Sequence, residues 1–189
     1  MNLWLWLVLA VALIGLYVWY AVIVTRRNRV SEALAGIDVQ LNQRHDLIPN
    51  LLAIARRFME HEKGLLEEIT ELRARAAGPV RPGDPQIAEK FSAEAALGAR
   101  MDALFAVAEN YPELQSHAPM IEAQRGYQEV ETNIAAARRF YNAAVADLRN
   151  AVQIFPGQLL AGLAGVGTPP PFFEVEAKVR APVNATDHL

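Results

Sequence analysis

The chain opens with an unbroken apolar segment, from Leu3 to Val24, that contains no charged residue. At 1.5 Å per residue, a helix of this length crosses the roughly 30 Å hydrocarbon layer of a membrane. A cleaved secretory signal would have a charged start, a shorter apolar core and a small-residue cleavage site. The pattern therefore predicts a retained transmembrane helix, in contact with lipid through residues 3–24. Aromatic residues that favour the headgroup boundary stand near its ends: Trp4, Trp6, Tyr17, Trp19 and Tyr20.

Positive charge lies on one flank of this segment only, at Arg26, Arg27 and Arg29. Basic flanks tend to remain on the cytoplasmic side of a membrane. We therefore expect the N-terminus outside and residues 25–189 in the cytoplasm.

Beyond the arginines, apolar positions recur every three or four residues with a mean period of 3.5, which is typical of helices that pack along a seam. This pattern predicts one continuous helix over residues 25–77, about 80 Å long at 1.5 Å per residue. Two glycines and three prolines in residues 78–85 end it. The seam consists of Val30, Leu34, Ile37, Leu41, Arg44, Ile48, Leu51, Ala55, Phe58, Glu62, Leu65, Ile69, Leu72 and Ala76.

Two further helices follow, over about residues 85–110 and 119–155. The last has a heptad repeat, with Tyr127, Ile134, Tyr141 and Leu148 among its members. Helical periodicity without strand-like alternation predicts an all-α fold. We expect an elongated antiparallel bundle of three long helices plus a short C-terminal apolar segment, divided into an anchor (1–24), the bundle (25–156) and a Gly/Pro-rich tail (157–189).

Composition narrows the chemistry that this fold can carry. The chain has no cysteine, which excludes disulfides, thiolate metal sites and a cysteine nucleophile. A net charge of −3 does not provide the basic surface that nucleic-acid binding needs. The "HEKGL" sequence at His61 lacks the second histidine of a zinc-protease motif, and the glycine-rich "GQLLAGLAGVG" lacks the Lys-Ser/Thr of a phosphate loop. We therefore expect no catalytic residue, metal or cofactor.

One polar cluster stands in the middle of the predicted seam helix, at His45, Asp46, Pro49 and Asn50. Pro49 has no N–H for the carbonyl of His45, so we expect a kink there. Asp46 and Asn50 are four residues apart, and either could bond to the freed backbone or to the other. The alternative hypothesis is a ligand or metal site, although His61 and Glu62 lie about 24 Å away along one helix.

Two charges interrupt the apolar seam, Arg44 and Glu62. Each either tilts its charged end into solvent or pairs with another helix and sets its register. If they pair, we expect Arg44→Leu and Glu62→Leu to preserve or raise thermal stability while making the assembly heterogeneous in size.

The segment that follows the last helix, residues 155–173, is apolar. Three alternating passes would bring it out at the end of the bundle far from the membrane, where an exposed apolar patch indicates a protein contact. We therefore expect an oligomer contact at this end, formed by Leu159, Leu160, Leu163, Phe172 and Phe173.

Three segments of the chain resemble the LemA family of bacterial membrane-anchored helical proteins: "RRNRVSEALAGIDVQLNQRHDLIPNLL", "AENYPEL" and "ARRFYNAAVADLRNAVQIFP", the last followed by "FFE". The resemblance covers about residues 20–174. The chain departs from the family pattern at Leu34-Ala35, where a Trp-Ser pair is usual, and at Glu131-Thr132-Asn133, where Glu-Asn-Arg is usual. The resemblance implies an elongated helical domain behind one transmembrane helix, with no assigned catalysis. Relatives include a magnetosome-membrane protein, which points to membrane organisation.

Together these features predict a non-enzymatic scaffold at the bacterial inner membrane, which self-associates as a homo-oligomer or recruits other membrane proteins. The alternative is a ligand- or metal-binding accessory or envelope-sensor protein that uses His45, Asp46 and Asn50.

Overall fold

The computed structural model describes residues 2–81 and 83–173, and every regular element in them is a helix. The all-α class is thereby confirmed. Four helices form the bundle: α1 (Asn2–Ala55), α2 (Lys63–Ala76), α3 (Ile87–Ala108) and α5 (Ala118–Gln153). Two single-turn helices, α4 (Pro112–Gln115) and α6 (Gly157–Leu160), precede and follow α5.

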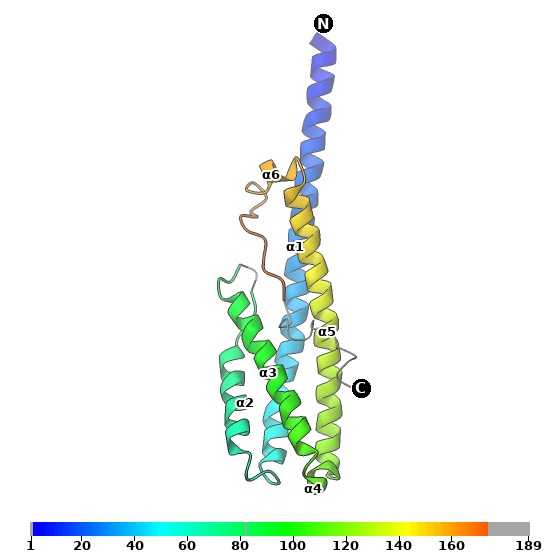
Figure 1. The fold of residues 1–189 in the computed structure, drawn as a ribbon. Helices are drawn as coiled ribbons and strands as arrows, with labels where there is room; N and C mark the ends of the chain where they lie inside the picture. Colours follow the sequence, from blue (N-terminus) through cyan, green and yellow to red (C-terminus); the bar gives the residue numbers. More distant parts are fainter. Residues whose placement is uncertain (1, 82, 174–189) are drawn as a thin grey trace, which may run out of the picture.

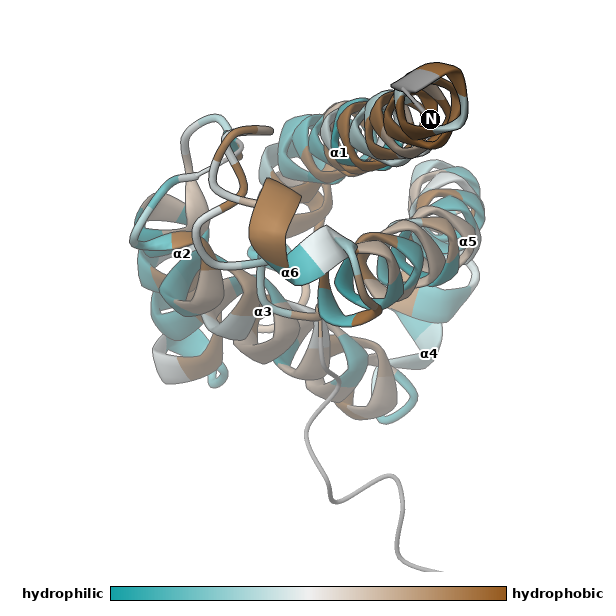
Figure 2. Ribbon diagram, turned by 90° about the horizontal axis from the view of Figure 1, so that it is seen from above, coloured by the Kyte–Doolittle hydropathy of each residue, from teal (hydrophilic) through white to brown (hydrophobic). Residues whose placement is uncertain are grey.

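The helices run antiparallel along one axis, with α1 as a rod that is longer than the rest of the molecule (Figure 1). The lower half of α1 packs mainly against α5, and α2 packs mainly against α3. The part of α1 that precedes Trp19 projects alone beyond the bundle (Figure 1). Seen from above, its hydrophobic colouring distinguishes it from the mixed colouring of α2, α3 and α5 (Figure 2).

The continuous helix predicted over residues 25–77 was wrong, because α1 ends at Ala55 and α2 begins at Lys63. The residues between them contain no Gly or Pro to signal a stop. Instead, Phe58 N–H bonds to the Ala55 carbonyl, and Met59 in this turn is completely buried. The apolar period continues through the turn because α2 has a buried seam of its own, formed by Leu66, Ile69, Leu72 and Ala76.

The bundle has four long helices where the sequence predicted three, so α5 runs in the direction opposite to the predicted one. It leads back toward the N-terminal apolar segment. The indole Nε1 of Trp19 donates a hydrogen bond to the Ala151 carbonyl (3.1 Å), and Arg27 Nη1 donates to the Ala164 carbonyl (3.3 Å). The segment after α5 therefore lies beside the middle of α1 (Figure 1). The expectation that it emerges at the opposite end of the bundle was wrong.

The chain after α6 then descends along the bundle and docks on it. Phe173 stacks on Phe91 of α3 with ring centroids 4.1 Å apart, and it is 3% exposed. Asn142 holds the Phe173 backbone from both sides, donating to its carbonyl (3.1 Å) and accepting from its N–H (2.9 Å). Phe172 lies under the guanidinium of Arg149.

These contacts divide the five residues that were expected to form an oligomer contact. Phe173 is core, and Phe172 and Leu160 are half-buried against the core. Leu159 and Leu163 remain 68% and 75% exposed. Within one chain, Phe91 and Asn142 already occupy the surfaces that Phe173 would offer to a partner.

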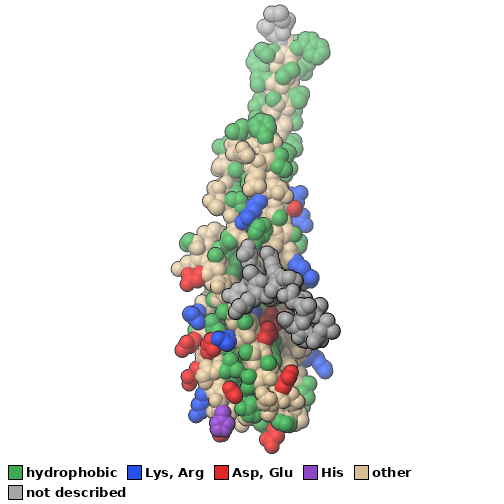
Figure 3. All heavy atoms as spheres, in the orientation of Figure 1, with side chains coloured by type: hydrophobic (Ala, Val, Ile, Leu, Met, Phe, Trp, Pro, Cys, Tyr) green, Lys and Arg blue, Asp and Glu red, His purple; other side chains and the backbone are tan. Residues whose placement is uncertain are grey.

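The apolar N-terminal segment itself has two parts. Large apolar side chains from Leu3 to Val18 are exposed, whereas Trp19 is half-buried and Ile23 is completely buried in the bundle core. Packing against the bundle thus begins before residue 25. The N-terminal part of α1 is long and apolar enough to cross a membrane, and its hydrophobic side chains cover the narrow top of the molecule in Figure 3.

Gly157 permits the close approach of the tail to α1, which gives a first prediction. A Cβ at this position would lie 2.0 Å from the Ala151 carbonyl oxygen and 2.8 Å from Trp19 Nε1. We expect Gly157→Ala to displace the tail and lower the free energy of unfolding by about 1–3 kcal/mol. Urea unfolding and Trp19 emission, in a Trp4→Phe/Trp6→Phe background, measure both effects.

Gly162→Ala is the matched control, because a Cβ at Gly162 has no neighbouring atom within 4 Å. Unchanged Trp19 emission and unchanged stability in Gly157→Ala would contradict the close approach.

Candidate functional site

A buried ionic cluster joins the helices at the middle of the bundle. Its members are Arg44 and His45 of α1, Glu94 of α3 and Glu131 of α5, and we call it the polar node. Arg44 and Glu94 are each 3% exposed and His45 is 8% exposed. Charged groups at this depth require partners, because burial removes their hydration.

Arg44 has three acceptors on two other helices. Its Nη2 bonds to the Glu94 carboxylate and to the Glu94 carbonyl (2.9 Å), and its Nη1 bonds to Glu131 Oε1 (2.8 Å). Burial alone would lower the pKa of Arg44, but attraction to Glu94 and Glu131 outweighs it and raises the pKa above the ordinary value. Arg44 is therefore a permanent cation that ties α1 to α3 and α5.

His45 completes the node from the same helix. Its Nε2 lies 2.8 Å from Glu94 Oε1, so the two oxygens of this carboxylate are shared between Arg44 and His45. Both carboxylate oxygens of Glu94 thus have partners inside the protein.

Pro49 shapes the α2 side of the node through the backbone. Proline has no N–H, so the His45 carbonyl, four residues earlier, lacks its usual helical donor. Arg73 Nε of α2 donates to this carbonyl instead, at 2.9 Å. Arg73, rather than Asp46 or Asn50, therefore forms the hydrogen bond to the freed carbonyl. The helix α1 continues through Pro49 to Ala55.

The pairing of Arg73 with the freed carbonyl predicts a thermodynamic coupling. Arg73→Met should lower the free energy of unfolding by about 1–3 kcal/mol, because it leaves a half-buried carbonyl unsatisfied. In a Pro49→Ala background the new N–H can reach the His45 carbonyl, so the same change should cost less. Urea unfolding of the four proteins in this cycle measures the coupling.

Arg75→Met is the control, because Arg75 is an exposed neighbour on the same helix. Equal costs of Arg73→Met with and without Pro49 would show that Arg73 does not serve the freed carbonyl.

The structure separates the other polar residues that the sequence grouped together. Asp46, Pro49 and Asn50 are exposed, whereas His45 is buried. Glu62 is half-buried just before α2 and accepts a long hydrogen bond from the Tyr111 hydroxyl (3.4 Å). Among residues 2–81 and 83–173, no three histidine or acidic side chains converge as metal ligands do.

The two seam charges thus differ. Arg44 pairs across helices within its own bundle, as one of the two alternatives predicts, whereas Glu62 lies at the edge of the first interhelical turn.

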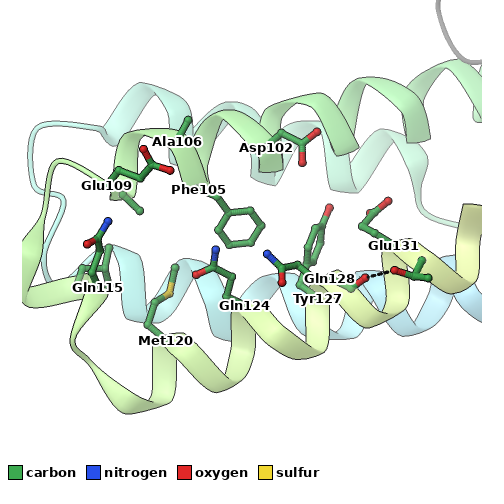
Figure 4. Close-up of a pocket in the computed structure, with 13 residues that line it drawn as sticks. Asp102, Phe105, Ala106, Glu109, Gln115, Met120, Gln124, Tyr127, Gln128 and Glu131 are labelled. Atoms are coloured by element: carbon green, nitrogen blue, oxygen red, sulfur yellow. Dashed lines mark hydrogen bonds between the residues drawn. The ribbon is translucent and has the colours of Figure 1, made fainter. Parts of the chain in front are cut away.

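A pocket adjoins the node between α3 and α5, toward α4, with a volume of about 750 Å³. Figure 4 shows the rings of Phe105 and Tyr127 side by side in it, with Gln124 and Gln128 of α5 lining one wall. Glu131 belongs to both the node and this pocket. Its side chain, 31% exposed, connects the buried ionic cluster with solvent.

Two groups in the pocket have perturbed acid–base properties. Among the residues that the structure describes, the buried Tyr127 hydroxyl has no hydrogen bond of normal geometry, and burial raises the pKa of Tyr127 well above its usual range. Desolvation and the negative charge of Glu131 raise the pKa of Asp102. The pocket therefore presents carboxylates, which bind cations and hydrogen-bond donors, together with amides and one neutral phenol, which can both donate and accept.

The basic flank of the apolar segment also takes part in the bundle. Arg26 pairs with Asp147 of α5 (2.6 Å), Arg27 donates to the Ala164 carbonyl, and Arg29 lies over the Phe140 ring (5.6 Å). These arginines join α1 to α5 and the tail, in addition to standing beside the apolar segment.

Reasoning from the sequence identified Arg44 and His45 but missed Glu94, Glu131 and Arg73. A signal for Glu94 was present, because it occupies an apolar-stripe position of α3, between Phe91 and Leu97. A carboxylate at a seam position on one helix and an arginine at a seam position on another predict a buried pair. Arg73 gave no comparable signal, since its acceptor is a backbone carbonyl.

The family model described as the LemA family matches residues 33–186, most of the chain. No curated protein matches the chain.

Proposed function

The chain belongs to the LemA family, and from this premise we propose that it is a membrane-anchored, non-enzymatic scaffold that self-associates or recruits partners at the bacterial inner membrane. The observation that carries the proposal is the continuity of α1. A single helix runs from the exposed apolar side chains of Leu3–Val18 into the bundle core at Ile23 and Val30. An anchor built this way holds the bundle at a set orientation to the membrane.

The absence of enzymatic activity is part of the proposal and rests on how the buried polar groups are used. In the polar node, both carboxylate oxygens of Glu94 are engaged, by Arg44 and His45. Catalytic groups need a free proton or lone pair directed at a substrate. A node whose central groups bond to one another supports a structural role, the alignment of α1, α3 and α5.

Partner contacts, on this proposal, use the outer surface of the bundle. The seam residues Leu34, Ile37 and Leu41 are buried within one chain. Exposed apolar side chains on other faces, such as Val39 of α1 and Phe140 of α5, supply contact area for a second copy or another membrane protein.

Membrane fractionation and a reporter fused after Leu189 test the anchor and its orientation. We expect the protein to stay with the membrane after alkaline carbonate washing. A reporter that works only in the cytoplasm should be active, because Arg26, Arg27 and Arg29 flank the C-terminal side of the anchor. Activity of an export-dependent reporter would reverse the orientation, and release by carbonate would refute the anchor.

Self-association has its own test, the mass of the full chain in detergent measured by size exclusion with light scattering. We expect more than one chain per particle. A uniform single-chain particle, together with no cross-linked partner in intact cells, would refute the scaffold.

One observation favours a second candidate function, the binding of a small ligand in the pocket between α3 and α5. The buried Tyr127 hydroxyl, which has no hydrogen bond of normal geometry within residues 2–81 and 83–173, lies beside a pocket of about 750 Å³ and the carboxylates of Asp102 and Glu131. This places the candidate near α4 rather than at His45, Asp46 and Asn50. Native mass spectrometry of the purified protein should then show a bound small molecule that Tyr127→Phe loses, and an unmodified chain mass would reject this candidate.

A further inference from the structure

We propose that the chain has a second membrane contact: the apolar loop, residues 154–166, inserts into the boundary between lipid headgroups and acyl chains beside α1. This inference rests on the proposed transmembrane anchor. The loop follows α5, includes α6, and carries four large apolar side chains that are more than half exposed: Ile154, Phe155, Leu159 and Leu163.

Two contacts fix the level of the loop along α1. At its start, Gly157 lies against Trp19, whose Nε1 would be 2.8 Å from a Cβ at Gly157. Near its end, Arg27 Nη1 bonds to the Ala164 carbonyl, and a Cβ at Gly165 would meet the same Nη1 at 3.0 Å. The loop therefore covers the part of α1 between Trp19 and Arg27, which is about 12 Å long.

The thickness of a membrane places that level at the lipid boundary. The freely exposed part of α1, from Leu3 to Val18, is only about 24 Å long at 1.5 Å per residue. A hydrocarbon layer of about 30 Å needs about 20 helical residues, which from Leu3 extends to about Val22. Trp19 then lies inside the hydrocarbon edge, and Arg27 lies about 7 Å outside it.

The composition of the loop matches this position. No charged residue occurs from Asn150 to Phe173, whereas charged residues are frequent on the bundle below. In Figure 3, hydrophobic side chains continue from the projecting helix onto the shoulder of the bundle, and the first basic residues appear beneath. Segments at the membrane surface bury their apolar side about 5–10 Å deep and keep basic residues at the polar edge.

Lipid is favoured over a second copy of the chain as the occupant because the loop is continuous with an apolar surface that the membrane already covers. A bilayer that surrounds α1 as far as Val22 also reaches the Gly157 end of the loop, which contacts Trp19. Leu159 and Leu163, both exposed, come two and six residues after Gly157. Without lipid around the loop, these two apolar side chains would be surrounded by water next to the membrane.

The absence of cysteine allows a direct test on the full chain. Leu163→Cys and Leu159→Cys, each carrying a nitroxide spin label, are reconstituted in phosphatidylcholine/phosphatidylglycerol vesicles. Collisions with oxygen, which concentrates in lipid, are compared with collisions with a water-soluble nickel chelate. We expect the label to collide with oxygen more often than with nickel at both sites. The nickel collision rate at both sites should also be several-fold lower than at a site exposed to water.

Two control sites separate this inference from the proposed anchor. Leu9→Cys lies on the exposed part of α1 and should report lipid, while Ile121→Cys, an exposed apolar residue at the start of α5, should report water. Lipid at Leu9 with water at Leu159 and Leu163 overturns the loop contact alone. Water at Leu9 overturns the anchor as well. Protection from both reagents with spin–spin broadening between labels means that a second copy covers the loop, which also overturns the lipid contact.

Discussion

Glu94→Leu is expected to lower the free energy of unfolding by about 3–5 kcal/mol, the cost of removing one partner from a buried ion pair. Arg44 would lose its buried carboxylate and keep only the backbone carbonyl of residue 94 and Glu131, whose side chain is 31% exposed, and His45 would lose the acceptor at 2.8 Å. Urea unfolding of the full chain in detergent, followed by helical circular dichroism, measures the loss.

The double variant Arg44→Met/Glu94→Leu should recover most of that loss, because apolar side chains replace both charges. Glu68→Leu is the matched control: its pair with Arg100 is also 2.8 Å long, but the side chains are 42% and 49% exposed. A pair this exposed contributes about 0–1 kcal/mol. Equal losses for Glu94→Leu and Glu68→Leu would contradict a stability role for the polar node.

The same geometry reverses the expectation for Arg44→Leu. From the seam pattern, pairing of Arg44 with another helix predicts that Arg44→Leu preserves or raises thermal stability. The single change leaves the Glu94 carboxylate buried at 3% exposure with His45 as its remaining side-chain partner. We therefore expect Arg44→Leu to be destabilising by itself and to be rescued by Glu94→Leu.

Phe173→Ala is the second change with a large expected effect, about 3–5 kcal/mol for a buried aromatic side chain. The ring fills the space against Phe91 and lies beneath Arg138, whose guanidinium is 4.9 Å from the ring centroid. Its loss opens a cavity over the upper core and weakens the hold of Asn142 on the tail. Urea unfolding, with near-ultraviolet circular dichroism as a probe of aromatic packing, measures both consequences.

Phe140→Ala is the control for Phe173→Ala, because Phe140 is 46% exposed on α5. Its replacement should change stability by no more than about 1 kcal/mol. A similar small effect for Phe173→Ala would mean that the tail is not docked. Partner contacts of Leu159 and Leu163 are best tested by point substitutions at these two residues. A deletion of the segment after α5 would also remove the contacts of Phe173 with Phe91 and of Pro171 with Tyr141.

Much of the molecule was predictable from the sequence because helical burial depends on local periodicity. Val30, Leu34, Ile37 and Ile48 are buried on one stripe of α1, and the heptad positions Tyr127 and Tyr141 are buried on α5. A helix places residues three and four apart on one face whatever it packs against. The all-α class, the apolar N-terminal helix and the inward faces follow from that regularity alone.

The path of the chain between those helices was decided only by tertiary structure. One long helix and two antiparallel helices have the same apolar period, and the turn after Ala55 is held by burial of Met59 rather than by a Gly or Pro signal. That turn sets the direction of α5, and hence whether the apolar loop lies beside Trp19 or at the far end. The partners of Arg44 and of the His45 carbonyl, Glu94 and Arg73, likewise depend on which helices become neighbours. Contacts between residues distant in the chain arise from packing the whole bundle, and a local pattern does not specify them.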